Sequence, residues 1–459
     1  MSEKHLVIVG AGLVGTLNAI LLAKRNLTVS VYEKRRDLRR EPPPSGRRTT
    51  NLALTSRGMA ALKQVGVAEQ IAPYQVAMFA RMVHEVDGTM HPLYYGRKEQ
   101  FILSTQRNKL NEILLNAAEK FPNLTCFFEH KLTSCNLKTG QLEFLHKGKK
   151  VRVQADVVFG NDGAHSTIRL EMMKCSLMDV QQIYVPYGYI ELPVAKTKNN
   201  DFALEPQHLH LWPRDDFLML CTANWDRTFN IALFMRFETF SSLKTEDDAV
   251  EFFKKHFPDA LALVGEKNLR SSFPTWCPYP MVTIKCSPYH IEGKALIMGD
   301  AAHAMLPFLA QGVNSGFEDC MLLNSLLDIH KDNFAAAFSE YSRCRKADAH
   351  AVCDLTLYNF LEMRQLVNTK TFRLKKKLDN ILHAILPNNW IPLYSMVAFT
   401  DIRYHICKQR KQYQDQILNC ILVLGAALLF FLLITTSYAC NIHQPNRFEM
   451  KGYSSRRIQ

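Results

Sequence analysis

Residues 5–35, HLVIVGAGLVGTLNAILLAKRNLTVSVYEKR, decide how the first part of the chain folds. Residues 5–9 form a short apolar run of strand length, and a glycine-rich turn follows it. Apolar residues then recur at helical spacing over 16–25, and 27–32 is apolar and rich in β-branched residues. This succession predicts a strand, a tight turn, a helix and a second strand, which is how a Rossmann-like α/β domain begins.

Three glycines, Gly10, Gly12 and Gly15, fill the turn with the spacing G-x-G-x-x-G. The first permits the tight turn, the second lets the backbone approach a pyrophosphate, and the third lets the helix pack on the strand. The diphosphate would then lie at the positive N-terminus of the helix. Glu33, at the end of the second strand, is placed to accept hydrogen bonds from an adenosine ribose. The stretch therefore predicts a dinucleotide site rather than a turn without a ligand. It does not distinguish FAD from NAD, because both carry the same ADP half.

The composition is that of a globular protein of two or three domains. The chain has 459 residues, of which 47% are hydrophobic and 22% are charged. Its 12 cysteines include no C-x-x-C pair and no zinc-ligand spacing, and the first expected strand begins too early to leave room for a cleaved leader. We therefore expect free thiols in a reducing compartment, and no metal site.

The chain is basic, with a formal net charge of +13. Nucleic-acid binding is not expected, because the basic residues do not alternate with aromatic ones along a stripe. A positive field would instead help to recruit an anionic cofactor such as NADPH. Six arginines and three prolines lie between Arg35 and Arg48, which predicts a loop. Two interpretations of this loop stay open: a solvated surface loop, or a site for a phosphate of FAD or NADPH.

Strand-like runs dominate the middle of the chain. Residues 184–237 contain several apolar runs of strand length, which suit a sheet inserted into the first domain. Earlier in the chain, 81–85 and 91–95 are expected to pair as a hairpin around the turn Asp87-Gly88.

The C-terminal stretch 417–438, ILNCILVLGAALLFFLLITTSY, carries no charge and has about the 20-residue length of a bilayer span. A buried core helix is the weaker alternative, because little of the chain follows that could cover it. Asn388, Asn389 and two prolines argue against a second full span in 381–400, where contact with the membrane stays open. We expect one transmembrane helix and a basic tail, 439–459. Cations flank the span on both sides: Lys408, Arg410, Lys411, Arg447, Lys451, Arg456 and Arg457.

Two further motifs follow the glycine turn in sequence order. The second motif is Asp162-Gly163 with Ser166, Thr167 and Arg169, and the third is Gly299-Asp300 with Pro307 and Gln311-Gly312-Val313-Asn314. Together with the glycine turn, their order and separation resemble the FAD-dependent aromatic hydroxylases, the single-component flavoprotein monooxygenases. This resemblance covers residues 5–330.

The likeness extends further, to runs such as LPFLAQGVNSGFEDC, LYNFLEMRQLVN and IPLYSMV and to the C-terminal apolar segment. These are similar to the kynurenine 3-monooxygenases of animals. The resemblance implies hydroxylation of L-kynurenine to 3-hydroxykynurenine with bound FAD, with NADPH as a transient co-substrate and with O2. It also implies the mitochondrial outer membrane, with the catalytic part facing the cytosol. No obligate protein partner is implied. The flavin and the amine of the substrate carry the chemistry in this family, so no catalytic side-chain base is expected.

The expected fold class is therefore α/β, with a Rossmann-like FAD-binding domain, an inserted β-sheet substrate domain, a C-terminal helical region and a C-terminal transmembrane helix. Within these parts, residues 151–159 are expected to form one strand and 334–371 one helical stretch. The expected segments are 1–180 and 291–330 for FAD binding, with part of the substrate sheet near 75–105, then 181–290 for the substrate domain, 331–410 for the helical region, 417–438 for the span and 439–459 for the tail.

The resemblance assigns FAD contacts residue by residue. The Asp300 carboxylate can bond a ribityl hydroxyl of the flavin. Backbone N–H groups at Gly312, Val313 and Asn314 can face the flavin from a helix start, whose positive end favours reduced, anionic flavin. The remaining FAD positions are Val14, Tyr32, Glu33, Lys34, Arg35, Ala53, Arg107, Leu132 and Thr167. Of these, Leu132 also fits a core strand. The chain has no second G-x-G-x-x-G, so NADPH is expected to dock transiently.

The substrate implied by the resemblance is an amino acid with an aniline ring. Its carboxylate needs a planar cationic partner, for which Arg81 in the run ARMVH is the candidate. Tyr95, on the neighbouring strand, can donate its hydroxyl to the same carboxylate. Asn359 and Tyr394 match the other substrate-binding positions of the family, although such residues in helical stretches are by themselves more often packing or capping residues.

One position departs from the family. Ala310 stands where glycine commonly precedes the Gln-Gly pair, and because alanine tolerates positive φ poorly, the backbone there is expected to differ slightly. His303 is interpreted as structural rather than as a proton donor. Two other functions stay open. A related hydroxylase of a lipophilic quinone or sterol precursor is disfavoured by Arg81 and Tyr95, and a non-enzymatic flavin-fold binding protein is disfavoured by the intact motifs.

Overall fold

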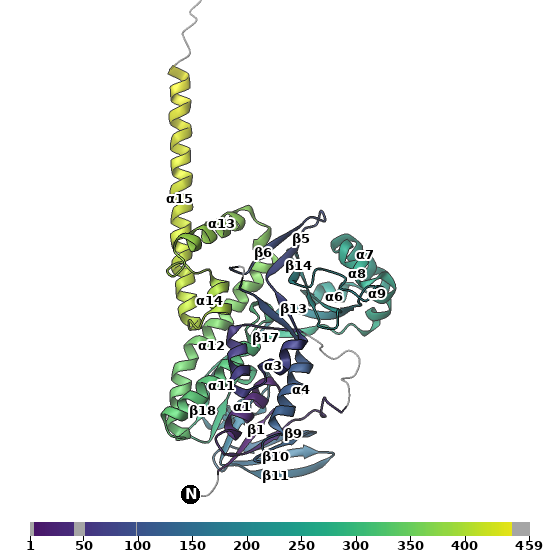
Figure 1. Ribbon diagram of the computed structural model, residues 1–459, viewed down its shortest axis with the longest axis vertical. Helices are drawn as coiled ribbons and strands as arrows, with labels where there is room; N and C mark the ends of the chain where they lie inside the picture. The colour runs from purple at the N-terminus through teal and green to yellow at the C-terminus, as the bar shows by residue number, and fades with distance from the viewer. Residues whose placement is uncertain (1–3, 41–50, 98, 443–459) are drawn as a thin grey trace, which may run out of the picture. The chain divides into compact units, whose positions relative to one another are not determined.

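The computed structural model describes residues 4–40, 51–97 and 99–442, and the chain divides into two units. The first unit, Met1–Gln409, holds the described sheets, and the second, Arg410–Gln459, holds the larger part of the last helix (Figure 1). Residues 41–48 of the arginine-rich segment lie outside the described residues, and so do residues 443–459 of the basic tail.

The glycine turn follows the central strand, β1 (His5–Val9), of a six-stranded sheet. β1 pairs in parallel with β2 (Thr28–Tyr32) on one side and with β12 (Val157–Gly160) on the other. These strands are nearly continuous apolar runs because helices cover both faces of a parallel sheet. The Rossmann-like opening is therefore confirmed. The outer strands are β8 (Leu124–Phe127) beside β2, then β19 (Ala295–Ile297) and β18 (His290–Ile291) beyond β12, and the helices include α1 (Leu13–Ala23), α4 (Arg107–Ala118) and α11 (Gly312–Ile329).

A seven-stranded, mostly antiparallel sheet is assembled from two distant parts of the chain. β5 (Ala80–His84) and β6 (Met90–Tyr94) form a hairpin, and β5 joins the later strands by pairing in parallel with β14 (His208–Arg214). The other strands are β13 (Asp179–Val194), β15 (Phe217–Ala223), β16 (Phe229–Arg236) and β17 (Tyr279–Ser287), and the helices that follow β16 are α6 (Phe237–Ser242), α7 (Glu246–His256), α8 (Pro258–Val264) and α9 (Glu266–Ser272).

A polar cluster fixes β5 in place, which matters because β5 carries Arg81. The His84 ring stacks on Trp212 with centroids 4.0 Å apart. The Asp259 carboxylate, at the start of α8, accepts a hydrogen bond from Trp212 Nε1 at 2.7 Å and lies 3.0 Å from His84 Nδ1. The two contacts tie the neighbouring strands β5 and β14 to α8.

The expectation of one strand over 151–159 is wrong. β11 (Lys149–Gln154) belongs to a small sheet with β10 (Gln141–His146) and β9 (His130–Asn136), whereas β12 belongs to the six-stranded sheet. The chain changes sheet at Ala155-Asp156, where the Ala155 N–H donates to Gly140 O and the Asp156 N–H donates to His5 O. The apolar residues alternate in β11, which has one solvated face, and run continuously in β12.

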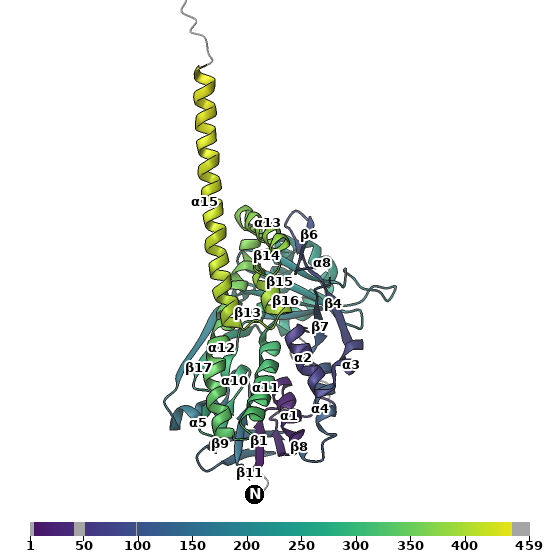
Figure 2. The same cartoon turned by 60° about the vertical axis from the view of Figure 1, so that its left-hand side comes forward.

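The helical stretch expected over 334–371 also divides. α12 (Phe334–Arg364) is followed by a short 3₁₀ turn and by α13 (Lys370–Ile385), whose first turn is capped by the Thr369 hydroxyl, which accepts from the Phe372 N–H at 3.3 Å. Figure 2 shows α11 and α12 side by side. The remaining elements are α2 (Ser56–Val65), α3 (Ala68–Ile71), α5 (Thr167–Cys175), α10 (Asp300–His303), α14 (Leu393–Phe399), β3 (Asn51–Leu54), β4 (Gln75–Met78), β7 (Ile102–Gln106) and the 3₁₀ turns Ala72–Tyr74, Phe273–Thr275, Pro307–Leu309 and Leu366–Asn368.

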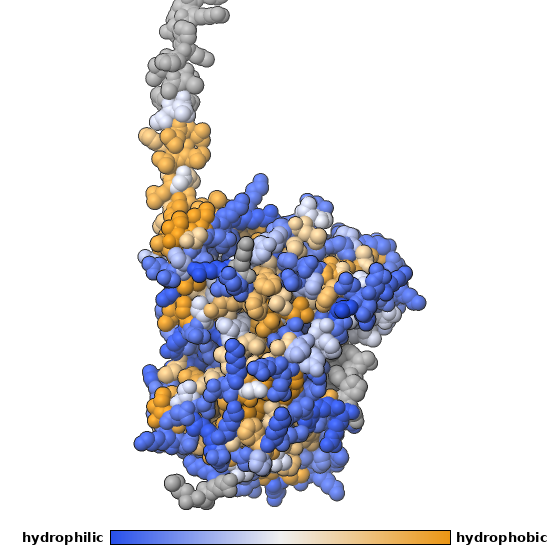
Figure 3. Space-filling view, viewed as in Figure 1, coloured by the Kyte–Doolittle hydropathy of each residue, from blue (hydrophilic) through white to orange (hydrophobic). Residues whose placement is uncertain are grey.

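The last helix, α15 (Tyr404–Ile442), begins in the first unit and makes up the described part of the second. Within the described residues it is the one helix long and apolar enough to cross a membrane. Its apolar surface is visible in Figure 3. A core helix would bury such side chains, but here they are more than half exposed: Val423, Leu424, Leu428, Leu429, Phe430, Phe431, Leu432 and Leu433. The stretch 381–400 is no second span, because Met396, Val397 and Ala398 of α14 are buried in the first unit.

Candidate functional site

The three glycines of the turn are required for different reasons. A Cβ added at Gly10, where φ is +105°, would lie 2.4 Å from Asn161 O, and one added at Gly15 would lie 1.9 Å from Gly10 O. These two glycines are demanded by the packing of the protein itself. A Cβ at Gly12, at the N-terminus of α1, would meet nothing within 4 Å. The protein offers no internal reason for this glycine, which fits the close approach of a ligand.

Glu33 closes the same turn from the neighbouring strand. Its carboxylate accepts hydrogen bonds from the Ala11 N–H and the Arg35 N–H, both at 2.9 Å. The end of β2 is thereby fixed to the glycine turn, with Lys34 and Arg35 exposed beside it. Arg107 is also exposed, in the first turn of α4.

Two of the predicted FAD positions have side chains in the hydrophobic core. The Tyr32 ring is stacked on Phe127 and on Phe144, with centroids 4.8 and 4.2 Å apart. Leu132, in β9, is 6% exposed and belongs to the same core. Their side chains serve packing. The Tyr32 carbonyl shapes the glycine turn directly, because it accepts the Gly10 N–H at 2.8 Å.

The Asp162-Gly163 motif is tied to the Gly299-Asp300 motif. The Asp162 carboxylate caps α5, since it accepts from the Ser166 hydroxyl and the Thr167 N–H, both at 2.6 Å. Burial raises the Asp162 pKa, although these hydrogen bonds act to lower it. Arg169, in the same helix, donates to Ala301 O at 2.7 Å. This bond joins α5 to α10, where the Asp300 side chain is exposed in the first turn.

The first turns of α1 and α11 meet at Gly299. A Cβ at Gly299 would lie 3.2 Å from a methyl of Val14, and one at Gly316 would lie 2.5 Å from a methyl of the same residue. Val14 therefore packs on both small residues, so the glycine turn, the Gly-Asp turn and the start of α11 lie together. At the start of α11, a Cβ at Gly312 would meet nothing within 4 Å. As at Gly12, the packing of the protein does not require a glycine at Gly312.

The Asn314 side chain is engaged in hydrogen bonds within the protein and is not available to a ligand. Its Oδ1 accepts the Thr55 N–H at 3.0 Å, and its Nδ2 donates to Ala53 O at 2.9 Å. A Cβ at Gly58, in α2, would lie 2.2 Å from the same Oδ1. The predicted FAD positions Ala53 and Asn314 are thus joined to one another, and the groups at the start of α11 that remain available to a ligand are backbone groups.

Ala310 adopts a left-handed backbone although alanine tolerates positive φ poorly. Its φ is +57° and its ψ is +26°, in the left-handed region where a Cβ is unfavourable by about 1–2 kcal/mol. The Ala310 N–H donates to Pro307 O in the 3₁₀ turn before α11. The backbone therefore keeps the conformation that suits glycine, and the alanine carries the strain.

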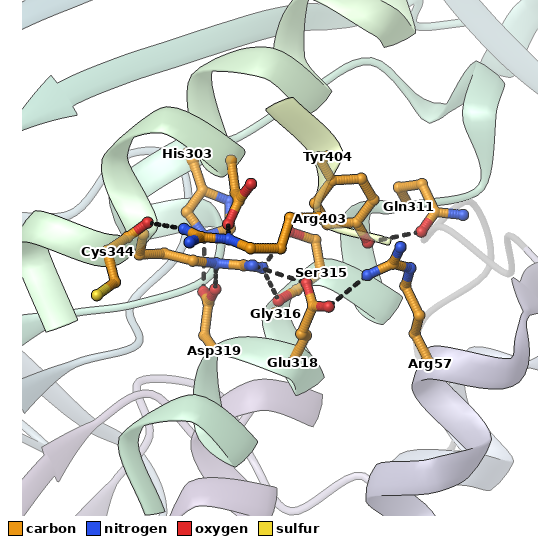
Figure 4. Close-up of polar contacts among 12 residues, drawn as sticks. Arg57, His303, Gln311, Ser315, Gly316, Glu318, Asp319, Cys344, Arg403 and Tyr404 are labelled. Carbon is orange, nitrogen blue, oxygen red and sulfur yellow. Dashed lines mark hydrogen bonds and ion pairs between the residues drawn. The ribbon is translucent and has the colours of Figure 1, made fainter. Parts of the chain in front are cut away.

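A buried network of charges holds α11 in place (Figure 4). Arg345, in α12, donates to Asp319 Oδ1 at 2.6 Å and to Glu318 Oε2 at 2.7 Å. Burial acts to lower the Arg345 pKa, but the two carboxylates hold it well above its usual value. Asp319 Oδ2 lies 2.6 Å from His303 Nε2 and accepts the Gly299 N–H at 2.8 Å. The Nε2 of His303 and the Gly299 N–H thus share one carboxylate oxygen, which fixes the turn at Gly299-Asp300.

The beginning of α15 takes part in the same network. The Tyr404 hydroxyl donates to Gln311 Oε1 at 2.8 Å, and both side chains are fully buried. The guanidinium of Arg57 lies 4.3 Å from the centre of the Tyr404 ring and is paired with Glu318. Gln311 immediately precedes α11, so the residues around Tyr404 support the turn from which that helix starts (Figure 4).

The four predicted substrate residues converge on one place, although they come from positions 81 to 394 of the chain. The Tyr95 and Tyr394 rings stack with centroids 4.7 Å apart, and the Arg81 guanidinium lies 5.1 Å from the Tyr394 ring centre. The Asn359 Nδ2 donates to Phe308 O at 2.6 Å, and its Oδ1 lies 3.5 Å from Arg81 Nη2. We call these four residues the arginine cage. Arg81 Nε and the Tyr95 hydroxyl are buried without a hydrogen-bond partner.

Electrostatics keeps these groups in their donor forms. Burial acts to lower the Arg81 pKa, but Glu362 and the two tyrosines raise it, so the guanidinium stays charged. Burial raises the pKa of Tyr95 well above its usual value and raises the pKa of Tyr394 to about 12. At neutral pH the arginine cage therefore offers a cation and two phenolic donors.

Glu362 is a member of the site that the sequence did not single out. Its Oε1 lies 3.3 Å from Arg81 Nη1, and it is held one helical turn beyond Asn359 in α12. A lone glutamate on a helix usually marks a solvated face, so no local signal distinguished it. Its spacing of three residues from Asn359 places both on one side of the helix, and that was the available clue.

Comparison with known proteins identifies the family to which the chain belongs. A family model described as FAD binding domain matches residues 3–356. The chain is 42% identical to kynurenine 3-monooxygenase of Sus scrofa over 94% of its own length and 90% of the relative, and 43% identical to that of Anopheles gambiae over 92% and 87%. The kynurenine 3-monooxygenase of Caenorhabditis elegans is 40% identical over 92% and 95%.

Solved structures share the fold at lower identity. The tetrameric form of 2-methyl-3-hydroxypyridine-5-carboxylic acid oxygenase superposes with a TM-score of 0.67 at 17% identity, over 80% of this chain and 95% of that one. Pseudomonas aeruginosa PqsL in complex with 2-aminobenzoylacetate gives 0.64 at 17% identity, over 79% and 97%. The predicted fold class is therefore confirmed.

The glycine turn leads to a testable prediction. Gly12→Ala should fold normally, because its Cβ would meet no protein atom within 4 Å, yet bind FAD at least roughly tenfold more weakly, about 1.4 kcal/mol, because the methyl blocks the pyrophosphate. The measurements are the thermal midpoint of the apoprotein and a fluorescence titration with FAD. Gly15→Ala is the contrasting variant, since its Cβ would collide with Gly10 O and damage the fold itself. Unchanged FAD affinity in Gly12→Ala would remove the turn from the cofactor site.

Proposed function

The chain belongs to the FAD-binding kynurenine 3-monooxygenases, and from this membership we propose that it hydroxylates L-kynurenine to 3-hydroxykynurenine with FAD, NADPH and O2. The observation that carries the substrate assignment is the arginine cage. A buried guanidinium and a buried phenol, each with an unused hydrogen-bond donor, form a site for a carboxylate. Kynurenine has such a carboxylate, together with an α-amino group and an aniline ring.

The residues present fit FAD. The turn at Gly12 and the start of α11 at Gly312 both leave space that the protein does not fill, and both are helix N-termini that favour negative charge. FAD, when bound and reduced by NADPH, supplies the activation of O2 and the transfer of one oxygen atom. The proposed FAD-binding positions are Gly10, Gly12, Val14, Gly15, Tyr32, Glu33, Lys34, Arg35, Ala53, Arg107, Leu132, Thr167, Asp300, Gly312, Val313 and Asn314.

The arginine cage would orient the substrate through its amino-acid end. Arg81 and Tyr95 donate to the carboxylate, and Glu362 offers the complementary charge to the α-amino group. Asn359 holds Arg81 from the side, because its own amide is fixed to Phe308 O. The Phe308 and Phe360 rings, stacked at 4.2 Å, add an apolar wall that excludes water beside this cage. The amine on the aniline ring supplies the electron density for oxygen transfer, so the side chains contribute orientation rather than a general base.

We also propose that the protein resides at the mitochondrial outer membrane with its first unit in the cytosol. The single apolar C-terminal helix is consistent with membrane anchoring, and the basic residues on both sides of the apolar stretch support a tail anchor. Protease treatment of intact mitochondria should digest the first unit without prior lysis. Protection of the first unit in intact mitochondria would contradict the cytosolic orientation.

A hydroxylase of a lipophilic substrate is the competing function. The apolar last helix would suit it, but the pair of the buried Arg81 with the partly buried Glu362 does not, because an apolar substrate would offer neither charge a new partner. A flavin-fold protein without activity would have no need of the arginine cage.

NADPH oxidation by the purified full-length protein tests the reaction. Oxidation should be slow alone and fast with L-kynurenine, and mass spectrometry should detect a product heavier by one oxygen. Bound flavin without a kynurenine-dependent product would favour the lipophilic-substrate hydroxylase. Absence of flavin from the purified protein would favour the binding protein.

Replacing Arg81 tests the substrate site. Arg81→Ala should raise the KM for kynurenine by a factor on the order of 30 to 1,000, because a charge-assisted pair to a carboxylate contributes roughly 2–4 kcal/mol. The ratio of flavin to protein absorbance should not change. Arg81→Ala also leaves the Glu362 carboxylate unpaired, and that carboxylate would repel the carboxylate of the substrate. The double variant Arg81→Ala/Glu362→Gln removes this repulsion and so isolates the attraction lost with Arg81. A KM equal to that of the unaltered protein in both variants would exclude Arg81 from the site.

A further inference from the structure

We propose that helix α13 (Lys370–Ile385) lies in the headgroup region of an anionic lipid bilayer and forms a second membrane contact of the chain. The inference goes beyond the proposed reaction, because it concerns a surface outside the arginine cage and outside the predicted span. It also differs from a second span, since α13 is too short to cross a bilayer.

The first observation is an unpartnered apolar stripe. None of the described side chains of α13 is buried. Leu374, Ile381 and Ile385 are 50, 54 and 68% exposed. Their spacings of seven and four residues put them on one side of the helix, together with the half-buried Leu378. Large aliphatic side chains aligned in this way are costly in water, so the stripe calls for an apolar partner.

The second observation is the charge beside the stripe. The helix carries Lys370, Arg373, Lys375, Lys376 and Lys377, and its one acidic residue is Asp379. The Asp379 carboxylate accepts the Trp390 Nε1–H at 2.6 Å and so belongs to the protein-facing side. Lys370 and Lys377 are exposed and are also seven residues apart, so they run alongside the apolar stripe. An apolar stripe edged by lysines is the pattern of a helix that lies in the plane of an anionic membrane surface.

The third observation is that the helix is already held on its other side. His383 Nδ1 lies 2.6 Å from Trp390 O, and Arg373 pairs with Glu85, which directly follows β5. These polar contacts hold α13 against neighbouring parts of the first unit and leave the apolar stripe on the exposed side. The helix is therefore held in a fixed orientation, with its apolar stripe exposed to the surroundings.

The bilayer is the favoured occupant because the same chain supplies the tether. The apolar stretch that can span a membrane begins at Ile417, a short distance along the chain from Ile385. Tethering raises the effective concentration of lipid at α13 and compensates for the modest affinity of a short interfacial helix. A second copy of this chain is the less suitable occupant, since pairing two α13 helices would bring two clusters of lysines together.

Chemical labelling of the full chain in vesicles tests the proposal. Ile381→Cys is made in a background in which Cys175, Cys277, Cys420 and Cys440 are replaced by Ser, and reaction with a membrane-impermeant maleimide is followed. Vesicles of phosphatidylcholine with phosphatidylserine are compared with phosphatidylcholine alone. Leu177→Cys is the matched control, because Leu177 is an aliphatic residue that is 98% exposed and lies outside α13.

The expected result is that Ile381→Cys reacts roughly tenfold or more slowly than Leu177→Cys in anionic vesicles, because lipid covers the apolar stripe. The added substitutions Lys370→Glu and Lys377→Glu should restore much of the reaction rate, while the protein still floats with the vesicles. Equal rates at positions 381 and 177 in protein that floats would overturn the α13 contact and leave the span intact. Protection that needs no vesicles and grows with protein concentration would assign the surface to a second copy and also overturn it. Protein that does not float would overturn both membrane contacts, without bearing on NADPH oxidation.

Discussion

The buried ion pair between Arg345 and Asp319 is the constraint on which the arrangement of the site depends. The two side chains are 3 and 0% exposed, and either charge left alone in the core would be strongly destabilising, by roughly 3–5 kcal/mol. The pair forms only when α12, α11 and the Gly-Asp turn are all in place, because Asp319 also holds Gly299 and His303. The same α12 carries Asn359 and Glu362 into the arginine cage. One helix therefore sets the positions of two proposed sites: the flavin-binding segment from Gly299 to Asn314 and the substrate site around Arg81.

Much of the site was accessible from the sequence where local physics dictates structure. The glycine turn, the strand before it and the helix after it follow from periodicity and from close approach of backbone atoms. The hairpin that brings Arg81 near Tyr95 follows from its Asp87-Gly88 turn. Asn359 and Tyr394 had no local signal and were reached through resemblance alone, since their proximity to Arg81 arises from packing between segments nearly 300 residues apart. Glu362 was missed for the same reason. Its partner is far away in sequence, and a glutamate in a helix looks like a solvated residue.

The errors in the sequence analysis also have a physical cause. Residues 151–159 are uniformly compatible with a strand, and only the tertiary structure reveals that two sheets share them, divided at Ala155-Asp156. A different limit applies to Leu132 and Tyr32, whose side chains lie in the core, so these two proposed FAD positions offer the cofactor mainly backbone groups. Ala310 is a further case. A deviation from the glycine-like backbone was predicted there, yet the residue has a positive φ, because the surrounding network over-determines the backbone strongly enough to keep a left-handed alanine.

The hydrogen bond from Tyr404 to Gln311 shows that the last helix begins inside the catalytic part of the protein, well before the apolar stretch that could span a membrane. From the sequence, the border between these two parts falls where the apolar run begins, at Ile417. In the structure the first residues of the same helix are buried in the core, and Tyr404 contacts Gln311, the residue before α11. A truncation that removes the apolar part of the last helix must therefore end nearer the C-terminus than the start of α15, so that Tyr404 is retained. A protein ending after Gln409 keeps the Tyr404 hydroxyl, whereas one ending before Tyr404 leaves the amide oxygen of Gln311 buried without its donor.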